Sequence, residues 1–262
     1  MSPARPARRP LVAGNWKMNL THLEAIALVQ KVAFSLTERQ LEAVEVAVFP
    51  PFISLRSVQT LVDGDKIEIG YGAQDLSPHA KGAYTGDVSG QMLAALRCRY
   101  VLVGHSERRE HHGEDDALIN AKIRAARQFE LLPILCVGEG LNIRQAGDQI
   151  EHCIAQLDAG LAGLSAQALG EFVVAYEPIW AIGTGEVATP QDAQEVCSEL
   201  RSRLSQTFDP AVAGATRILY GGSVKADNAE GIFAQPDVDG GLVGGASVNA
   251  QDFAAICRAA VS

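Results

Sequence analysis

The chain contains 262 residues, of which 47% are hydrophobic and 20% charged, and its formal net charge at pH 7 is -9. Such a composition excludes wholesale disorder, and the length fits one or two domains. The acidic balance argues against nucleic acid or an acidic membrane as a partner, because either would be repelled. An anionic ligand would need a local positive field on this acidic background.

The first ten residues differ from the rest, because they contain three arginines, three prolines and no acidic residue. No apolar segment long enough for the core of a secretory signal follows them. No run approaches the ~18 apolar residues of a membrane helix. We expect residues 1–10 to form a flexible N-terminal arm, and residues 11–262 to form one domain, because no linker divides them.

The cysteines and histidines give no disulfide or metal signal. The five cysteines are an odd number without a Cys-x-x-Cys pair, and such usage favours a reducing, cytoplasmic location. His111 and His112 are adjacent and would diverge on a helix, so we predict no metal site.

Eight short, nearly continuous apolar segments recur, as expected for strands that are buried on both faces. They are Leu11–Lys17, Val44–Pro50, Ile67–Gln74, Tyr100–His105, Leu132–Val137, Phe172–Glu177, Arg217–Gly222 and Asp239–Gly244. Helical patterns lie between them. The predicted helices cover 25–34, 54–62, 90–96, 117–128, 148–157 and 190–204, and two more begin at Asn228 and Gln251.

Two of these helices have clear start signals. Thr21 and Glu24 form a capping-box pattern before the first. Thr189-Pro190 places an N-cap residue before a proline at the first helical position. The eightfold alternation of strand and helix predicts an α/β protein built as a single-domain (β/α)8 barrel, with a doubly wound sheet as the alternative.

In such barrels the chemistry lies at the C-terminal ends of the strands. Asn15 and Lys17 end the first predicted strand, His105 ends the fourth and Glu177 ends the sixth. A buried carboxylate after an apolar strand is costly unless it is partnered or functional, and partial burial would tune it as a base. The competing interpretations are a surface lysine, a satisfied core histidine and an ion-paired structural glutamate.

Glycines follow the last two predicted strands, as Gly221-Gly222-Ser223 and Gly244-Gly245. Glycine lets backbone N–H groups approach an anion closely, and barrels often bind phosphate between these two loops. Each pair alone is typical of a tight turn. Residues 178–185 join apolar side chains to glycines, which suits either a mobile lid or a well-packed loop.

Seven stretches of the chain match a known family in its own order. They are AGNWKMN (13–19), GAYTGDVS (82–89), VLVGHSERR (101–109), PILCVGE (133–139), VAYEPIWAIGTG (174–185), LYGGSV (219–224) and LVGGAS (242–247). The chain resembles the triosephosphate isomerase family and its TIM barrel. The resemblance implies reversible isomerisation of D-glyceraldehyde 3-phosphate and dihydroxyacetone phosphate through an enediolate, in glycolysis and gluconeogenesis, without a cofactor or metal.

The resemblance also implies roles for individual residues. Glu177 moves the proton, neutral His105 polarises the carbonyl, Lys17 supplies positive charge and Asn15 a hydrogen bond, while Glu107 pairs with Lys17. Substrate and its phosphate contact Asn15, Lys17, Gly183, Ser223, Leu242, Gly244 and Gly245. Residues 178–185 close over the site, Ile182 moves down on Glu177, and Trp180 lies against Glu139 and Tyr176 when the lid is open.

In the family, the segment corresponding to 82–89 inserts into a second subunit, which implies a homodimer. Its acid, Asp87 here, is shorter than the usual glutamate, which puts in question its pairing with the residue corresponding to Arg108 in the partner. Two alternatives remain: a related isomerase of a longer ketose phosphate such as a tetrulose phosphate, and a phosphate-binding barrel without turnover. The second predicts loss of Glu177, His105 or Lys17, and all three are present.

Overall fold

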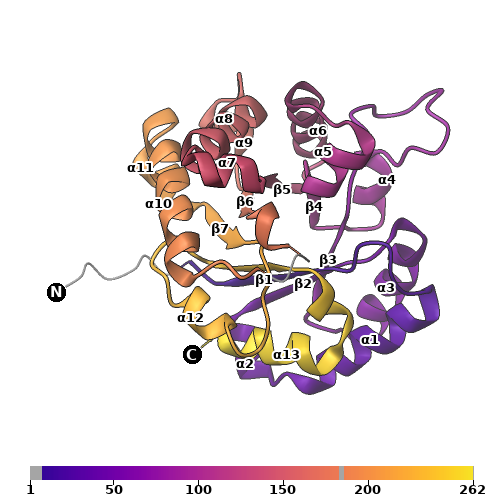
Figure 1. The fold of residues 1–262 in the computed structure, drawn as a ribbon. Helices are drawn as coiled ribbons and strands as arrows, with labels where there is room; N and C mark the ends of the chain where they lie inside the picture. Colours follow the sequence, from indigo (N-terminus) through magenta and orange to yellow (C-terminus); the bar gives the residue numbers. More distant parts are fainter. Residues whose placement is uncertain (1–7, 183–185, 262) are drawn as a thin grey trace.

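The computed structural model describes residues 8–182 and 186–261. Eight parallel strands close into a barrel in the order β1 to β8, with β1 paired to both β2 and β8, and helices surround it (Figure 1). The predicted (β/α)8 barrel is confirmed, and the doubly wound alternative is excluded by the β1–β8 pairing. The strands are β1 (Leu11–Asn15), β2 (Glu45–Phe49), β3 (Gly70–Ala73), β4 (Tyr100–Val103), β5 (Leu132–Val137), β6 (Val173–Tyr176), β7 (Arg217–Tyr220) and β8 (Gly240–Val243).

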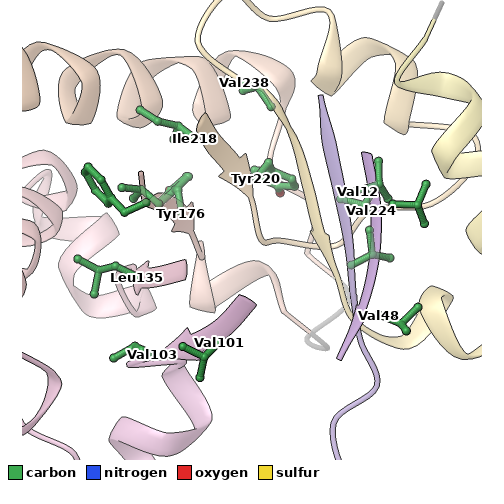
Figure 2. Packing of buried hydrophobic residues seen from close by; sticks show 14 of the residues in the cluster. Val12, Val48, Val101, Val103, Leu135, Tyr176, Ile218, Tyr220, Val224 and Val238 are labelled. Atoms are coloured by element: carbon green, nitrogen blue, oxygen red, sulfur yellow. The ribbon is translucent and has the colours of Figure 1, made fainter. Parts of the chain in front are cut away.

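The strands are apolar on both faces because each face packs against a different cluster. Side chains such as Leu11, Ala13 and Phe49 fill the barrel interior. Their neighbours Val12 and Val48 join a second cluster, which includes many helix residues. Figure 2 shows part of this outer cluster on the strands and on the segments next to them. The alternation of side chains along a strand also places the functional residues. The inward-facing positions of β1 continue to Asn15, and those of β6 continue to Glu177.

The predicted helices are all present. The helices longer than seven residues are α1 (His22–Ser35), α3 (Phe52–Asp65), α6 (Asp116–Gln128), α8 (Gln149–Leu161), α10 (Pro190–Thr207) and α13 (Ala250–Ala259). The capping boxes expected at Thr21 and Thr189 both form. Among the described residues, no helix combines the length and apolar character needed to cross a membrane.

Shorter helices complete the ring. They are α2 (Glu38–Ala43), α4 (Gly90–Ala95), α5 (Ser106–His112), α7 (Leu141–Ala146), α9 (Ala166–Leu169), α11 (Pro210–Ala215) and α12 (Ala229–Phe233), with the 3-10 turns η1 (Ile179–Ala181) and η2 (Gly245–Val248). Sequence patterns do not predict α2, α7, α9 and α11, because segments of four to six residues are too short for a clear helical period.

Several strands end earlier than predicted, and the difference lies at the functional end of the barrel. The first strand ends at Asn15 rather than Lys17, because Lys17 has a φ of 52°, in the left-handed region. The seventh ends at Tyr220, before its glycine pair. The residues beyond these ends form loops that surround the mouth of the barrel.

At the opposite, N-terminal end, Asp239 joins several parts of the chain. Its side chain, 1% exposed, pairs with Arg8 at 2.8 Å and with Arg201 at 2.6 Å. The same carboxylate accepts a hydrogen bond from the N–H of Ile218 at 3.0 Å. Arg8, which sequence analysis assigned to the N-terminal arm, therefore contacts the barrel.

Glu45 makes a second network at this end. Arg217 donates to it at 2.7 Å and the Tyr100 hydroxyl at 2.5 Å, while Arg99 lies 3.2 Å away. Burial raises the pKa of Glu45, but the hydrogen bond from Tyr100 and the charges of Arg217 and Arg99 outweigh it and lower the pKa. Both buried carboxylates at the N-terminal end are thus paired with arginines.

Candidate active site

A cavity of about 710 Å³ opens at the C-terminal ends of the strands. It brings together eight of the ten residues predicted for the site. Of the other two, Glu107 is not part of the lining but contacts the lining residue Lys17. Gly183 lies outside the described residues. The lining residues are Asn15, Lys17, His105, Glu177, Ile182, Gly221, Gly222, Ser223, Val224, Lys225, Ala226, Asp227, Leu242, Gly244, Gly245, Ala246 and Asp252.

Lys17 is held from several sides. Its Nζ lies 2.6 Å from Oε1 of Glu107, and its N–H donates to Oδ1 of Asn15 at 3.1 Å. The Gln74 amide donates to the Lys17 carbonyl at 2.8 Å, which helps to hold a backbone conformation that side chains other than glycine rarely adopt. The lysine charge therefore has a fixed place on one side of the cavity.

His105 stands at the N-terminus of α5, directly after β4. Its Nδ1 accepts the backbone N–H of Glu107 at 3.2 Å, and its Nε2 lies 2.9 Å from Oε1 of Glu177. An Nδ1 that accepts presents its lone pair, so the ring N–H that faces Glu177 is the one on Nε2. Burial lowers the pKa of His105, but the Glu177 carboxylate outweighs it and raises the pKa.

Glu177 is buried, with 2% of the residue exposed. Besides His105, it accepts the N–H of Ser106 at 3.0 Å and lies 3.4 Å from the Ser106 hydroxyl. Burial raises the pKa of Glu177, but the attraction of His105 and these hydrogen bonds outweigh it and lower the pKa. The carboxylate is therefore ionised, which is the state that a general base needs.

The backbone of Glu177 approaches Gly138 so closely that only glycine fits at this position. A Cβ added to Gly138, after β5, would lie 1.9 Å from the Glu177 carbonyl oxygen. The close approach places Glu177 beside Cys136, which is fully buried. Burial and the nearby Glu177 charge raise the pKa of the Cys136 thiol, so this cysteine is a packing residue rather than a nucleophile.

The other side of the cavity is formed by the loops after β7 and β8. Ser223, Leu242, Gly244 and Gly245 all line it, and η2 begins at Gly245. A Cβ added to Gly245 would meet no atom within 4 Å, so the packing of the fold does not require glycine there. Bare backbone facing open space is what close approach of an anion needs.

Trp180 and Tyr176 meet at Glu139, as the resemblance implies for an open lid. The indole Nε1 donates to Oε1 of Glu139 at 2.7 Å and the Tyr176 hydroxyl donates at 3.0 Å. The Arg144 guanidinium stacks over the indole at 5.5 Å. Ile182 is part of the cavity lining. Residues 183–185 of the predicted lid lie outside the described residues.

Sequence reasoning missed four polar residues of the site. Ser106 binds Glu177, and Lys225, Asp227 and Asp252 line the outer part of the cavity. Lys225 and Asp227 follow Ser223 in the same loop. The prediction of Ser223 as a site residue could therefore have been extended to them. Asp252 lies in α13, where nothing in the local pattern distinguishes it from an exposed helix residue.

Known proteins match this chain over nearly all of its length. The family model described as triosephosphate isomerase matches residues 10–260. Proteins named triosephosphate isomerase from Mycobacterium tuberculosis and Mycobacterium bovis are each 60% identical over 254 residues, which is 97% of both chains. The one from Mycobacterium avium is 58% identical over the same share.

Proposed function

The chain belongs to the triosephosphate isomerase family, and from this premise we propose how its cavity works. It is an isomerase that interconverts D-glyceraldehyde 3-phosphate and dihydroxyacetone phosphate, a reaction of glycolysis. One observation carries the assignment of roles: the buried Glu177 carboxylate lies 2.9 Å from Nε2 of His105, and the Nδ1 of the same ring accepts the N–H of Glu107 at 3.2 Å. A base and a hydrogen-bond donor thus meet on the inner wall of a cavity with the shape and backbone for a phosphate ester.

Glu177 acts as the base. It takes a proton from the hydroxyl-bearing carbon next to the substrate carbonyl, so that the C–H electron pair forms the C=C bond of the enediolate and the carbonyl oxygen takes the negative charge. The hydroxyl proton then passes to that oxygen, and the resulting carboxylic acid returns its proton to the former carbonyl carbon while the other carbon becomes the new carbonyl. To reach the substrate, the carboxylate has to leave Ser106 and His105. The contact with Glu177 that raises the pKa of His105 then disappears, which favours the neutral ring.

His105 and Lys17 stabilise the charge that develops. The Nε2–H of His105, released by Glu177, donates to the carbonyl oxygen and then to the enediolate oxygens. Lys17, fixed by Glu107 and Asn15, places its positive charge beside the same oxygens. Preorganised groups of this kind need no rearrangement when the charge appears. Ser223, Leu242, Gly244 and Gly245, together with Gly183, hold the phosphate end.

The test is a coupled assay with glyceraldehyde 3-phosphate, comparing the wild type with Glu177→Gln. We expect the variant to lose at least ~10³ in turnover, because a missing general base costs about 10²–10⁴. Tetrulose phosphate as a second substrate separates the triose isomerase from a relative that acts on a longer chain. Near-wild-type turnover in Glu177→Gln would remove Glu177 as the base.

We also propose that the protein is a homodimer through residues 82–89. The segment between β3 and α4 extends away from the barrel (Figure 1), and Tyr84 within it is 45% exposed. Other large apolar side chains are exposed as well: Met18, after β1, is 95% exposed, and Ile53, in the first turn of α3, is 80% exposed. Several exposed large apolar groups of this kind support an interface with a second copy of the chain.

The dimer proposal has its own test. Sedimentation should give a dimer for the wild type, and Tyr84→Glu, which puts a charge on the extended segment, should shift it to the monomer. Wild-type turnover by that monomer would contradict an essential interface. We further propose a cytoplasmic location, which is supported by five cysteines that are all free and buried.

A further inference from the structure

The cavity extends beyond the positions assigned to the phosphate. After Ser223 its wall continues through Val224, Lys225, Ala226 and Asp227, and Asp252 of α13 also lines it. Val224 is buried and anchors this segment, whereas Lys225 and Asp227 are exposed. The outer wall therefore carries three charged side chains to which the isomerase reaction assigns no role.

Asn228 fixes the backbone of this wall. Its side-chain oxygen accepts the N–H of Lys225 at 2.8 Å, and its side-chain nitrogen donates to the carbonyl of Ser223 at 3.0 Å. The N–H of Ala229 adds a bond to the Lys225 carbonyl at 3.0 Å. One side chain thus holds both Ser223, at the phosphate end, and the backbone from which Lys225 extends.

The charges that line the cavity would repel an anionic substrate unless a positively charged side chain offsets them. The acids Glu177, Asp227 and Asp252 outnumber the lysines Lys17 and Lys225, and the whole chain is acidic. Lys17 already lies 2.6 Å from Glu107. Lys225 has no ion pair within residues 8–182 and 186–261, so its charge is available to an approaching ligand.

We propose that Lys225 is a capture residue for the phosphomonoester dianion of the substrate. It offsets the repulsion of Asp227 and Asp252 at the mouth, raises the local concentration of the dianion, and delivers it to Ser223 and the glycine loops. The proposal rests on the proposed function, because it concerns the same substrate and site. Lys225 acts on binding and not on the proton transfer.

Lys225→Gln tests the proposal in the coupled assay across a range of ionic strength. A unit charge about 10 Å from a dianion in water changes its capture by roughly 2–5-fold at low salt, and the effect is screened beyond about 0.1 M. We expect kcat/KM to fall by that factor at low ionic strength, kcat to stay the same, and the difference to shrink as salt is added. Lys225→Arg should restore the wild-type profile.

Two variants serve as matched controls. Asp227→Asn, on the same wall, should raise kcat/KM at low salt, because it removes a repelling charge. Lys31→Gln, an exposed lysine on α1, makes the same change in net charge away from the cavity and should leave kcat/KM unchanged. Equal losses in Lys225→Gln and Lys31→Gln, or a loss independent of salt, would overturn the proposal. Failure of the proposed function would differ, because the wild type itself would then not turn over the substrate.

Discussion

The two ends of the barrel are both rich in buried charge, and they use it in opposite ways. At the N-terminal end, the carboxylates of Asp239 and Glu45 each meet two arginines within the described part of the chain. At the C-terminal end, Glu177 and His105 meet mainly each other, beside a cavity of about 710 Å³. Groups whose partners can be exchanged for substrate can do chemistry, whereas groups with fixed partners hold the strands together.

The largest effect that separates the two ends is expected for Lys17→Met. Loss of the fixed positive charge beside the enediolate should lower kcat by about 10³, or about 4 kcal/mol. The unfolding free energy should change little, because the Glu107 side chain left behind is 44% exposed and can be solvated. Kinetics and urea unfolding on the same preparation check both parts. A kcat that stays within tenfold of the wild type would contradict the charge assignment.

Asp239→Asn is the corresponding change at the other end. It leaves Arg8 and Arg201 without their shared carboxylate at a site whose side chain is 1% exposed. Breaking a buried pair in this way should cost about 3 kcal/mol of unfolding free energy. The turnover of the folded fraction should stay within a few-fold of the wild type. Urea unfolding at a fixed protein concentration measures the first effect, and a large drop in kcat would show that the two ends are not independent.

The sequence predicts the C-terminal end of the barrel better than the N-terminal end. The strands, the main helices and the C-terminal site follow from local patterns, because apolar runs, caps and the residues just past each strand are contiguous in sequence. The N-terminal network has no such pattern: Arg8 and Asp239 are 231 positions apart. Only closure of the barrel brings them together, so the sequence pattern alone places Arg8 in a flexible arm.

The details within the predicted site were also beyond local patterns. The sequence pattern places both Asn15 and Lys17 at the end of the first strand, but the strand ends at Asn15 and a left-handed backbone redirects Lys17. Its conformation depends on Gln74, which follows β3. The contact between Ser106 and Glu177 spans 71 positions. Residue types at strand ends can be predicted, but the partner that each has before substrate arrives depends on the packed loops.

A smaller effect is expected when the contact between Glu177 and His105 is removed. His105→Gln removes the group that lowers the pKa of Glu177, and burial then raises this pKa above the ordinary value of 4.5. The contribution of ionised Glu177 to the free energy of unfolding therefore changes sign. In the wild type, ionised Glu177 stabilises the fold above pH 4.5, and this contribution is lost as the pH falls through the lowered pKa. In the variant, burial of the charge destabilises the fold at neutral pH, and protonation relieves the penalty as the pH falls through the raised pKa.

A titration followed by 13C NMR of labelled glutamate carboxyls measures this shift. The Glu177 signal should titrate at higher pH in His105→Gln than in the wild type. His111→Gln is the matched control, because His111 is an exposed histidine of the same helix α5. An unchanged Glu177 titration in His105→Gln would mean that Ser106, not His105, keeps the carboxylate ionised.

The smallest expected effect lies within the N-terminal end and refines the comparison. Glu45 meets two arginines, but the side chain of Arg217 is 14% exposed and that of Arg99 is 53% exposed. Because exposed ion pairs contribute little, Arg99→Met should change the unfolding free energy by less than about 0.5 kcal/mol. Arg217→Met should cost several times more, since it also removes the donor to the Tyr100 hydroxyl at 2.9 Å. Equal losses in urea unfolding would mean that stability at this end follows the number of ion pairs rather than their burial.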